Sequence, residues 1–306
     1  MPRGIISVLQ TPFTDNGDVD LISLGRLVEH AISAGVHGFL VPAVASEVAY
    51  LSSEERRTIV DLALRTVAGR VPVIVGASAD SAPESVSYIR GMDRTGALGY
   101  LVAVPAFVYE RQELAEGFFG EIADGSRLPM VIQDLQFGGY GLRLETMKRL
   151  WESMPTLAGF KVETVPAGPK YTALRETFGE RVFVAGGWAI PQMIEALDRG
   201  VDALIPESSM VSVYRAVYDF FVAGRRDEAT ALFRRLLPVL TFTNQEIGTS
   251  VAFFKRLLRR KGVFRCEKMR MKGLLWDKYS ERIGEDLVEL VLALETDARG
   301  TGTPVA

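Results

Sequence analysis

A single lysine stands inside an apolar run at residues 157–164, where its chemistry would be unusual. If this run is a β-strand, Gly159, Lys161 and Glu163 point to one face, whereas Ala158 points to the other, toward a covering helix. Burying an ammonium group costs several kcal/mol unless the group is paired or loses its proton. A neutral lysine amine can attack a ketone and form a Schiff base. The alternatives are an ion-paired strand lysine and a strand end that meets water.

Composition excludes several other kinds of site. The chain has 306 residues, 48% of them hydrophobic, and a formal net charge of −3, which does not predict a nucleic-acid partner. Cys266 is the one cysteine, and His30 and His37 are the two histidines, so we expect no disulfide framework, metal site or cofactor. The sequence shows no signal peptide and no apolar run of membrane-spanning length. A cytoplasmic protein that acts on a small molecule is therefore expected.

Apolar runs alternate with helical patterns along most of the chain, as in a parallel sheet covered on both faces. Ser52 and Glu55, for example, form a capping-box pattern at the start of one helix. The runs lie at residues 4–9, 38–41, 71–75, 100–104, 130–133, 157–164, 181–185 and 203–206. Eight such units within roughly 220 residues predict an α/β fold, a (β/α)₈ TIM barrel. A doubly wound open sheet is the alternative, but no G-x-G-x-x-G follows the first strand.

The pattern changes to helices alone after Gly224. We therefore expect two parts, a barrel catalytic domain at residues 1–224 and a C-terminal helical extension at residues 225–306. The expected helices of the extension carry apolar faces that a lone barrel would not need. These faces favour a homo-oligomer, either a dimer or a tetramer.

Barrel chemistry takes place at the C-terminal ends of the strands, where the loops meet. Lys161 and Glu163 lie at that end of the sixth strand, and Gln133 is predicted to join them as a catalytic residue from the fifth. The backbone N–H groups of the small residues that follow the second strand could bind a carboxylate. The expected substrate-binding residues are Ala43, Val44, Ala45, Ser46, Glu47, Phe107, Asp134, Gly186, Gly187 and Trp188.

Three segments resemble the dihydrodipicolinate synthase/N-acetylneuraminate lyase family. They are residues 159–164, Thr11-Pro12-Phe13, and Ser46-Glu47 with Leu51-Ser52-x-x-Glu55-Arg56. The similarity covers nearly the whole chain. It implies a barrel whose Lys161 forms a Schiff base with pyruvate or another 2-keto acid, and a carboxylate-binding loop at residues 43–47. It also implies a homo-oligomer, since members are commonly tetramers.

The chain departs from this family at positions that matter for chemistry. Val44 and Ala45 replace two threonines, and Gln133 and Phe107 replace two tyrosines. The arginine that synthases use has no counterpart near Gly138. Because an amide cannot serve as a phenolic acid or base, dihydrodipicolinate synthesis is not expected.

One branch, the 2-keto-3-deoxy-L-arabonate dehydratases, resembles the chain more closely. The resemblance rests on residues 132–134, 160–164, 187–188 and 244–246. It implies that Glu163 is the acid/base that removes a C3 proton, with Gln133 only orienting the substrate. The sequence thus predicts a class I lyase, a dehydratase or aldolase of a 2-keto-3-deoxy acid. The alternatives are a 4-hydroxy-tetrahydrodipicolinate synthase, an N-acetylneuraminate lyase-like pyruvate aldolase, and a non-catalytic relative that binds keto acids.

Overall fold

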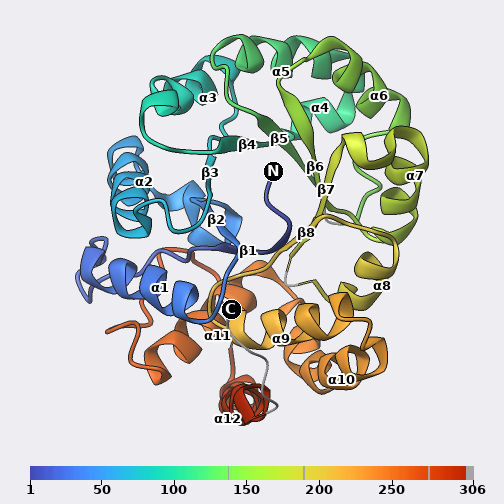
Figure 1. Cartoon of the computed structure of the whole chain (residues 1–306). Helices are drawn as coiled ribbons and strands as arrows, with labels where there is room; N and C mark the ends of the chain where they lie inside the picture. The colour runs from blue at the N-terminus through green and yellow to red at the C-terminus, as the bar shows by residue number, and fades with distance from the viewer. Residues whose placement is uncertain (137, 189, 275, 301–306) are drawn as a thin grey trace.

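The computed structural model describes residues 1–136, 138–188, 190–274 and 276–300. Its strands are all parallel and close into a barrel in chain order, as Figure 1 shows. They are β1 Gly4–Val8, β2 Gly38–Val41, β3 Val73–Gly76, β4 Gly99–Ala103, β5 Met130–Leu135, β6 Leu157–Glu163, β7 Phe183–Gly187 and β8 Ala203–Ile205. The predicted TIM barrel is therefore confirmed, and the open sheet is excluded.

Helices surround the barrel, and the start of α2 shows how the sequence sets a helix boundary. The Ser52 hydroxyl accepts a hydrogen bond from the N–H of Glu55, and the Glu55 carboxylate accepts one from the N–H of Ser52. The predicted capping box is therefore confirmed. The helices around the barrel are α1 Leu21–Ser33, α2 Ser53–Val67, α3 Ala82–Ile89, α4 Ala106–Glu110, α5 Ala115–Asp124, α6 Leu144–Ser153, α7 Gly168–Phe178, α8 Met193–Asp198 and α9 Val211–Val222.

The inside of the barrel is filled by alternate strand residues of moderate size. Leu40, Ile74, Leu101 and Val131 come from four neighbouring strands and belong to one buried cluster. The residues between them face outward and pack under the helices in two further clusters. This alternation is the period of two that places every second side chain in the barrel.

Strand β6 contains an irregularity that the sequence does not reveal. The pairing with β5 shifts, so that Met130 lies opposite Leu157 and Val131 lies opposite Gly159. Ala158 is thereby left over, and it packs against the cluster inside the barrel. The expectation that Ala158 faces a helix is wrong, because a bulge changes which face a residue occupies.

The C-terminal extension shares the core of the barrel. It consists of α10 Arg226–Thr243, α11 Ile247–Arg260 and α12 Lys278–Gly300. Leu236 on α10 and Val291 on α12 belong to the same buried cluster as Val213 on α9. Most apolar faces of the extension are therefore covered within the chain. The division at residues 224 and 225 remains a prediction.

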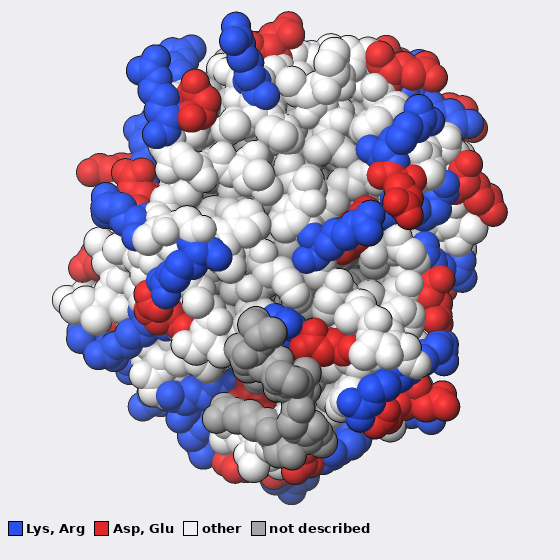
Figure 2. Space-filling model, in the orientation of Figure 1, with Lys and Arg blue, Asp and Glu red and all other residues white. Residues whose placement is uncertain are grey.

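The surface carries charges of both signs. On the face shown in Figure 2, basic and acidic side chains alternate around the rim, and the central area is largely uncharged. Within the described ranges, no helix combines the length and the apolar character that crossing a membrane requires.

Candidate active site

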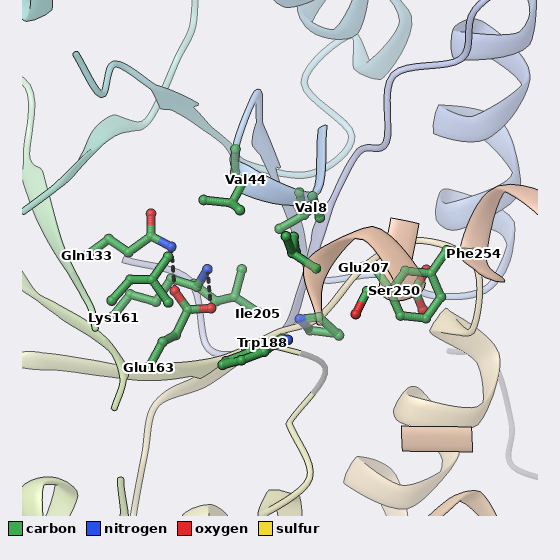
Figure 3. Close-up of a pocket in the computed structure, with 15 residues that line it drawn as sticks. Val8, Val44, Gln133, Lys161, Glu163, Trp188, Ile205, Glu207, Ser250 and Phe254 are labelled. Carbon is green, nitrogen blue, oxygen red and sulfur yellow. Dashed lines mark hydrogen bonds and ion pairs between the residues drawn. The ribbon is translucent and has the colours of Figure 1, made fainter. Parts of the chain in front are cut away.

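A small cavity opens at the C-terminal ends of the strands, and the centre of a water-sized sphere can move through about 40 Å³ of it. Figure 3 shows the side chains around it. Its lining comes from the barrel and from α11: Val8, Ala43, Val44, Ala45, Gln133, Leu135, Lys161, Glu163, Trp188, Ile205, Pro206, Glu207, Ile247, Ser250 and Phe254. The three predicted catalytic residues are all among them.

Lys161, Glu163 and Gln133 form one hydrogen-bonded group in this cavity (Figure 3). The Nζ of Lys161 lies 3.0 Å from Oε1 of Glu163, and both side chains are 4% exposed. The amide nitrogen of Gln133 donates to the other oxygen of the same carboxylate. Lys161 is thus ion-paired, as one of the two alternatives to a Schiff-base lysine requires. Its partner, however, is a carboxylate that also lines the cavity.

The backbone around Lys161 must be compact for this group to form. Gly187 on β7 lies so close that a Cβ there would collide with the Glu163 carboxylate and with the Lys161 side chain. Trp188, the next residue, has a φ of 51° and lines the cavity. Gly187 and Trp188 therefore lie where the sequence placed them, beside the lysine.

The loop after β2 brings small residues to the cavity wall. Residues Val44–Ser46 form a short 3₁₀ turn, and the first N–H groups of such a turn have no partner within it. Ser46 turns its hydroxyl inward, where it donates to the carbonyl of Leu9 at 2.5 Å and accepts from the N–H of Ala43 at 2.9 Å. Ala43, Val44 and Ala45 line the cavity, whereas Ser46 holds the turn in place.

Glu47 lies outside the cavity, contrary to its prediction as a substrate-binding residue. Its carboxylate is buried and pairs with Lys255 of α11. It also accepts hydrogen bonds from the N–H groups of Arg270 and Met271, each at 2.7 Å. Burial lowers the pKa of Lys255 to about 8. Glu47 therefore joins the loop to the C-terminal extension.

Asp134 also lies outside the cavity, because it alternates with Gln133 and faces the helices. Its carboxylate is buried and lies 2.7 Å from Nζ of Lys170. It also accepts hydrogen bonds from the Tyr109 hydroxyl at 3.1 Å and the Leu142 N–H at 2.9 Å. Burial raises the pKa of Asp134, although Lys170 acts in the opposite direction. The expectation that Asp134 contacts substrate is corrected accordingly.

Phe107 and Gly186 are likewise absent from the described lining of the cavity. Phe107 packs edge-on against Phe118 of α5, with ring centroids 5.6 Å apart. A Cβ on Gly186 would meet the Tyr171 hydroxyl, on the helical side of the sheet. Both positions therefore face the surrounding helices and not the cavity.

Several lining residues escaped the prediction from sequence. Val8 and Ile205 end the strands on either side of the barrel closure, and the strand pattern could have identified them. Ile247, Ser250 and Phe254 come from α11, far away in sequence, and no local signal marks them. Glu207 follows β8, and its carboxylate is buried.

Comparison with known proteins agrees with this geometry. A sequence model of the dihydrodipicolinate synthetase family matches residues 1–274. An L-2-keto-3-deoxyarabonate dehydratase of Azospirillum brasilense is 29% identical over 275 residues, which is 88% of this chain and 87% of the relative. A 4-hydroxy-tetrahydrodipicolinate synthase of Xanthomonas campestris pv. campestris is 31% identical over 263 residues, 85% of each chain.

A solved structure shares the fold over the full length. The 4-hydroxy-tetrahydrodipicolinate synthase of Methylacidiphilum fumariolicum SolV superposes with a TM-score of 0.89 and 20% identity. The superposition covers 99% of this chain and 100% of the other. At that identity, the likeness shows the barrel and its C-terminal helices.

Proposed function

The chain belongs to the dihydrodipicolinate synthetase family, and from that premise we propose that it is a Schiff-base lyase that dehydrates a 2-keto-3-deoxy acid. One observation carries this function. A buried lysine, a carboxylate 3.0 Å from it and an amide that binds the same carboxylate all face one cavity. The similarity to the Azospirillum dehydratase supports a substrate such as 2-keto-3-deoxy-L-arabonate.

The Lys161–Glu163 pair can prepare the nucleophile. Transfer of a proton from the ammonium to the carboxylate leaves a neutral amine, whose lone pair attacks C2 of the keto acid. The carbinolamine hydroxyl then takes that proton back from the Glu163 carboxyl and leaves as water, which gives an iminium ion and restores the Glu163 carboxylate. The substrate carboxylate would accept hydrogen bonds from the N–H groups of Val44 and Ala45. These contacts would hold C2 beside the amine.

Glu163 can then move the proton that dehydration requires. As a carboxylate it takes a proton from C3 of the iminium ion, and the C–H electron pair forms the enamine. The enamine expels the C4 hydroxyl, which takes the proton from the Glu163 carboxyl and leaves as water. Hydrolysis of the conjugated iminium ion releases the product and restores Lys161. Gln133 holds the carboxylate in place through its amide N–H.

Synthase chemistry is the second candidate, favoured by the similarity to the Xanthomonas enzyme. Condensation needs a phenol and hydroxyl relay, and position 133 provides an amide while Val44 provides an alkyl group. We therefore expect no measurable condensation of pyruvate with aspartate semialdehyde. Robust condensation would replace the dehydratase assignment with the synthase.

Borohydride trapping tests the covalent step. With pyruvate present, reduction should add a pyruvyl mass to the peptide that contains Lys161. The same treatment of Lys161→Ala should give no adduct, and Lys148→Ala, outside the site, should give the wild-type adduct. An adduct on another lysine would exclude Lys161 as the Schiff-base residue, and the lack of an adduct with any 2-keto acid would exclude the mechanism.

The assembly and location of the protein extend this proposal. We infer a homo-oligomer, a dimer or a tetramer, because Tyr279 and Ile283 on α12 remain exposed at 54% and 41%. Light scattering at micromolar concentration should give at least a dimer mass, and a monomer would refute it. A cytoplasmic location suits an enzyme of keto-acid metabolism, and cell fractionation tests it.

A further inference from the structure

A second carboxylate lies in the wall of the same cavity. Glu207 follows β8, is 3% exposed, and lines the cavity together with Ser250 and Phe254. In the view of Figure 3, these three residues lie on the side opposite Lys161 and Glu163. The dehydration steps do not use Glu207, so its position requires another explanation.

Hydrogen-bond donors surround the Glu207 carboxylate. The amide of Gln10 donates to Oε2 at 2.7 Å, the N–H of Ser209 donates to the same oxygen, and the N–H of Met210 donates to Oε1 at 3.2 Å. The N–H groups of Ser209 and Met210 lie at the start of α9, and together with the Gln10 amide they favour the ionised carboxylate. Burial acts in the opposite direction and raises the pKa of Glu207. The charge of Lys261 opposes this effect, but Lys261 is paired with Glu295 at 2.6 Å.

The charges around the cavity do not balance. Among the described lining residues, Lys161 is the cation, whereas Glu163 and Glu207 are both carboxylates. Lys161 is already paired with Glu163. The N–H groups of the loop after β2 can accommodate one anion, which is the carboxylate that every 2-keto acid carries. A second anionic group would find no further cation among the described lining residues.

Ser250 is the other polar residue on this side, and its hydroxyl already donates to the carbonyl of Thr243. Val8 and Phe254 are buried hydrophobic residues that line the cavity with Glu207. A second carboxylate or phosphate placed there would lose its hydration without gaining a partner, and it would be repelled by Glu207. An uncharged hydroxyl, in contrast, could donate a hydrogen bond to the Glu207 carboxylate.

We propose that Glu207 determines the substrate class by selecting 2-keto acids whose far end is uncharged and rejecting those that end in a carboxylate or phosphate. This inference rests on the proposed function and specifies the substrate for it. Glu207 acts as a built-in anion at the far end of the site, while the reaction itself takes place at Lys161. A specificity-determining role of this kind predicts a change in preference rather than a uniform loss of rate.

Two 2-keto-3-deoxy acids of equal length provide the test, one ending in CH₂OH and the other in a carboxylate. At pH 8 and low ionic strength, we expect wild-type kcat/KM to favour the neutral-ended acid by about 10- to 100-fold, as for like charges brought together. In Glu207→Gln the ratio should fall about tenfold or more, through a gain on the acid-ended substrate. Because both substrates are measured in each variant, a general loss of activity cancels.

A wild-type ratio near one, or an unchanged ratio in Glu207→Gln, would overturn the role of Glu207. If neither acid is turned over, each is tested as a competitor of pyruvate trapping at Lys161, and the neutral-ended acid should protect better. If pyruvate gives no adduct at all, the proposed function has failed. Calorimetric titration of the wild-type protein with the same two acids then still tests the charge selection, which predicts tighter binding of the neutral-ended acid.

Discussion

Replacing Glu163 by glutamine removes the proposed acid/base and leaves its neighbours in place. The carboxylate accepts from both Lys161 and Gln133. In Glu163→Gln the new carbonyl oxygen can accept from Lys161, while the new NH₂ donates to Gln133 after that amide flips by 180°. Both contacts are thus kept, and the buried group has no orphaned donor. The substitution therefore separates proton transfer from folding.

The expected loss is that of a general acid/base. Turnover should fall about 10²- to 10⁴-fold, which corresponds to about 3–5 kcal/mol of activation free energy. The Schiff base should still form, because the substitution leaves Lys161 and the cavity around it in place. Stability should change little, and Glu176→Gln, which is exposed on α7, serves as the matched control.

The assay is a comparison of two readouts on the same protein. Steady-state turnover of a 2-keto-3-deoxy acid reports proton transfer, and borohydride trapping of pyruvate reports imine formation. Turnover within tenfold of the wild type, or loss of the adduct from a folded Glu163→Gln protein, would refute the assignment of Glu163.

The structure changes what is expected of Gln133→Glu. From the sequence alone, Gln133 only orients the substrate. Because its amide contacts the Glu163 carboxylate, a glutamate there would place two carboxylates in contact, and they would have to share a proton. The substitution should therefore impair turnover as severely as Glu163→Gln. Nearly unchanged turnover would show that the amide is dispensable.

Two further predictions concern the elements that hold the site. Lys255→Met leaves the buried Glu47 without its cation, so chemical denaturation should show that the free energy of unfolding falls by about 3 kcal/mol. Substitution of the exposed Lys272 by Met should change it little, and an equal effect of the two substitutions would contradict the prediction. The hydrogen bond from Arg270 lowers the pKa of Glu55 from 4.5 to about 2. Since the folded-state pKa is the lower one, this charge stabilises the fold above pH 4.5 and the stabilisation is lost as the pH falls through 2. Above pH 4.5 the free energy of unfolding of the wild type should exceed that of Glu55→Gln by about 1 kcal/mol after solvent screening. Acid denaturation should show this difference disappear between pH 4.5 and 2, and a difference that stays constant over that range would refute the linkage.

The barrel and the lysine strand were predictable because their signals are local. Each apolar run is covered on both sides, so its place in the chain follows from composition, although its exact ends do not. The face of Lys161 and Glu163 follows from the period of two. The same rule would have placed Asp134 outside, had the fifth strand been extended to Leu135 as the structure has it. That error came from ending the strand too early.

Other features depend on contacts that no local pattern encodes. The bulge at Ala158 depends on how β5 and β6 pair. The lining residues of α11 depend on how the extension packs over the barrel. Glu47 shows the same limitation, since its partner Lys255 lies 208 positions away in the chain. A sequence can identify a glutamate next to a small-residue loop, but not the lysine that neutralises it.

Two buried lysine–glutamate pairs show how location separates structure from chemistry. Lys255 and Glu47 are fully buried, and two backbone N–H groups donate to the same carboxylate. This burial separates the pair from any substrate with which it could exchange a proton. Lys161 and Glu163 form the same kind of pair, but both line the cavity at the C-terminal ends of the strands. Burial lowers the pKa of Lys255 to about 8 although this lysine belongs to a structural pair, so a perturbed lysine does not by itself indicate catalysis. Access to a ligand beside a proton acceptor is the reason why we propose Lys161, and not Lys255, as the Schiff-base lysine.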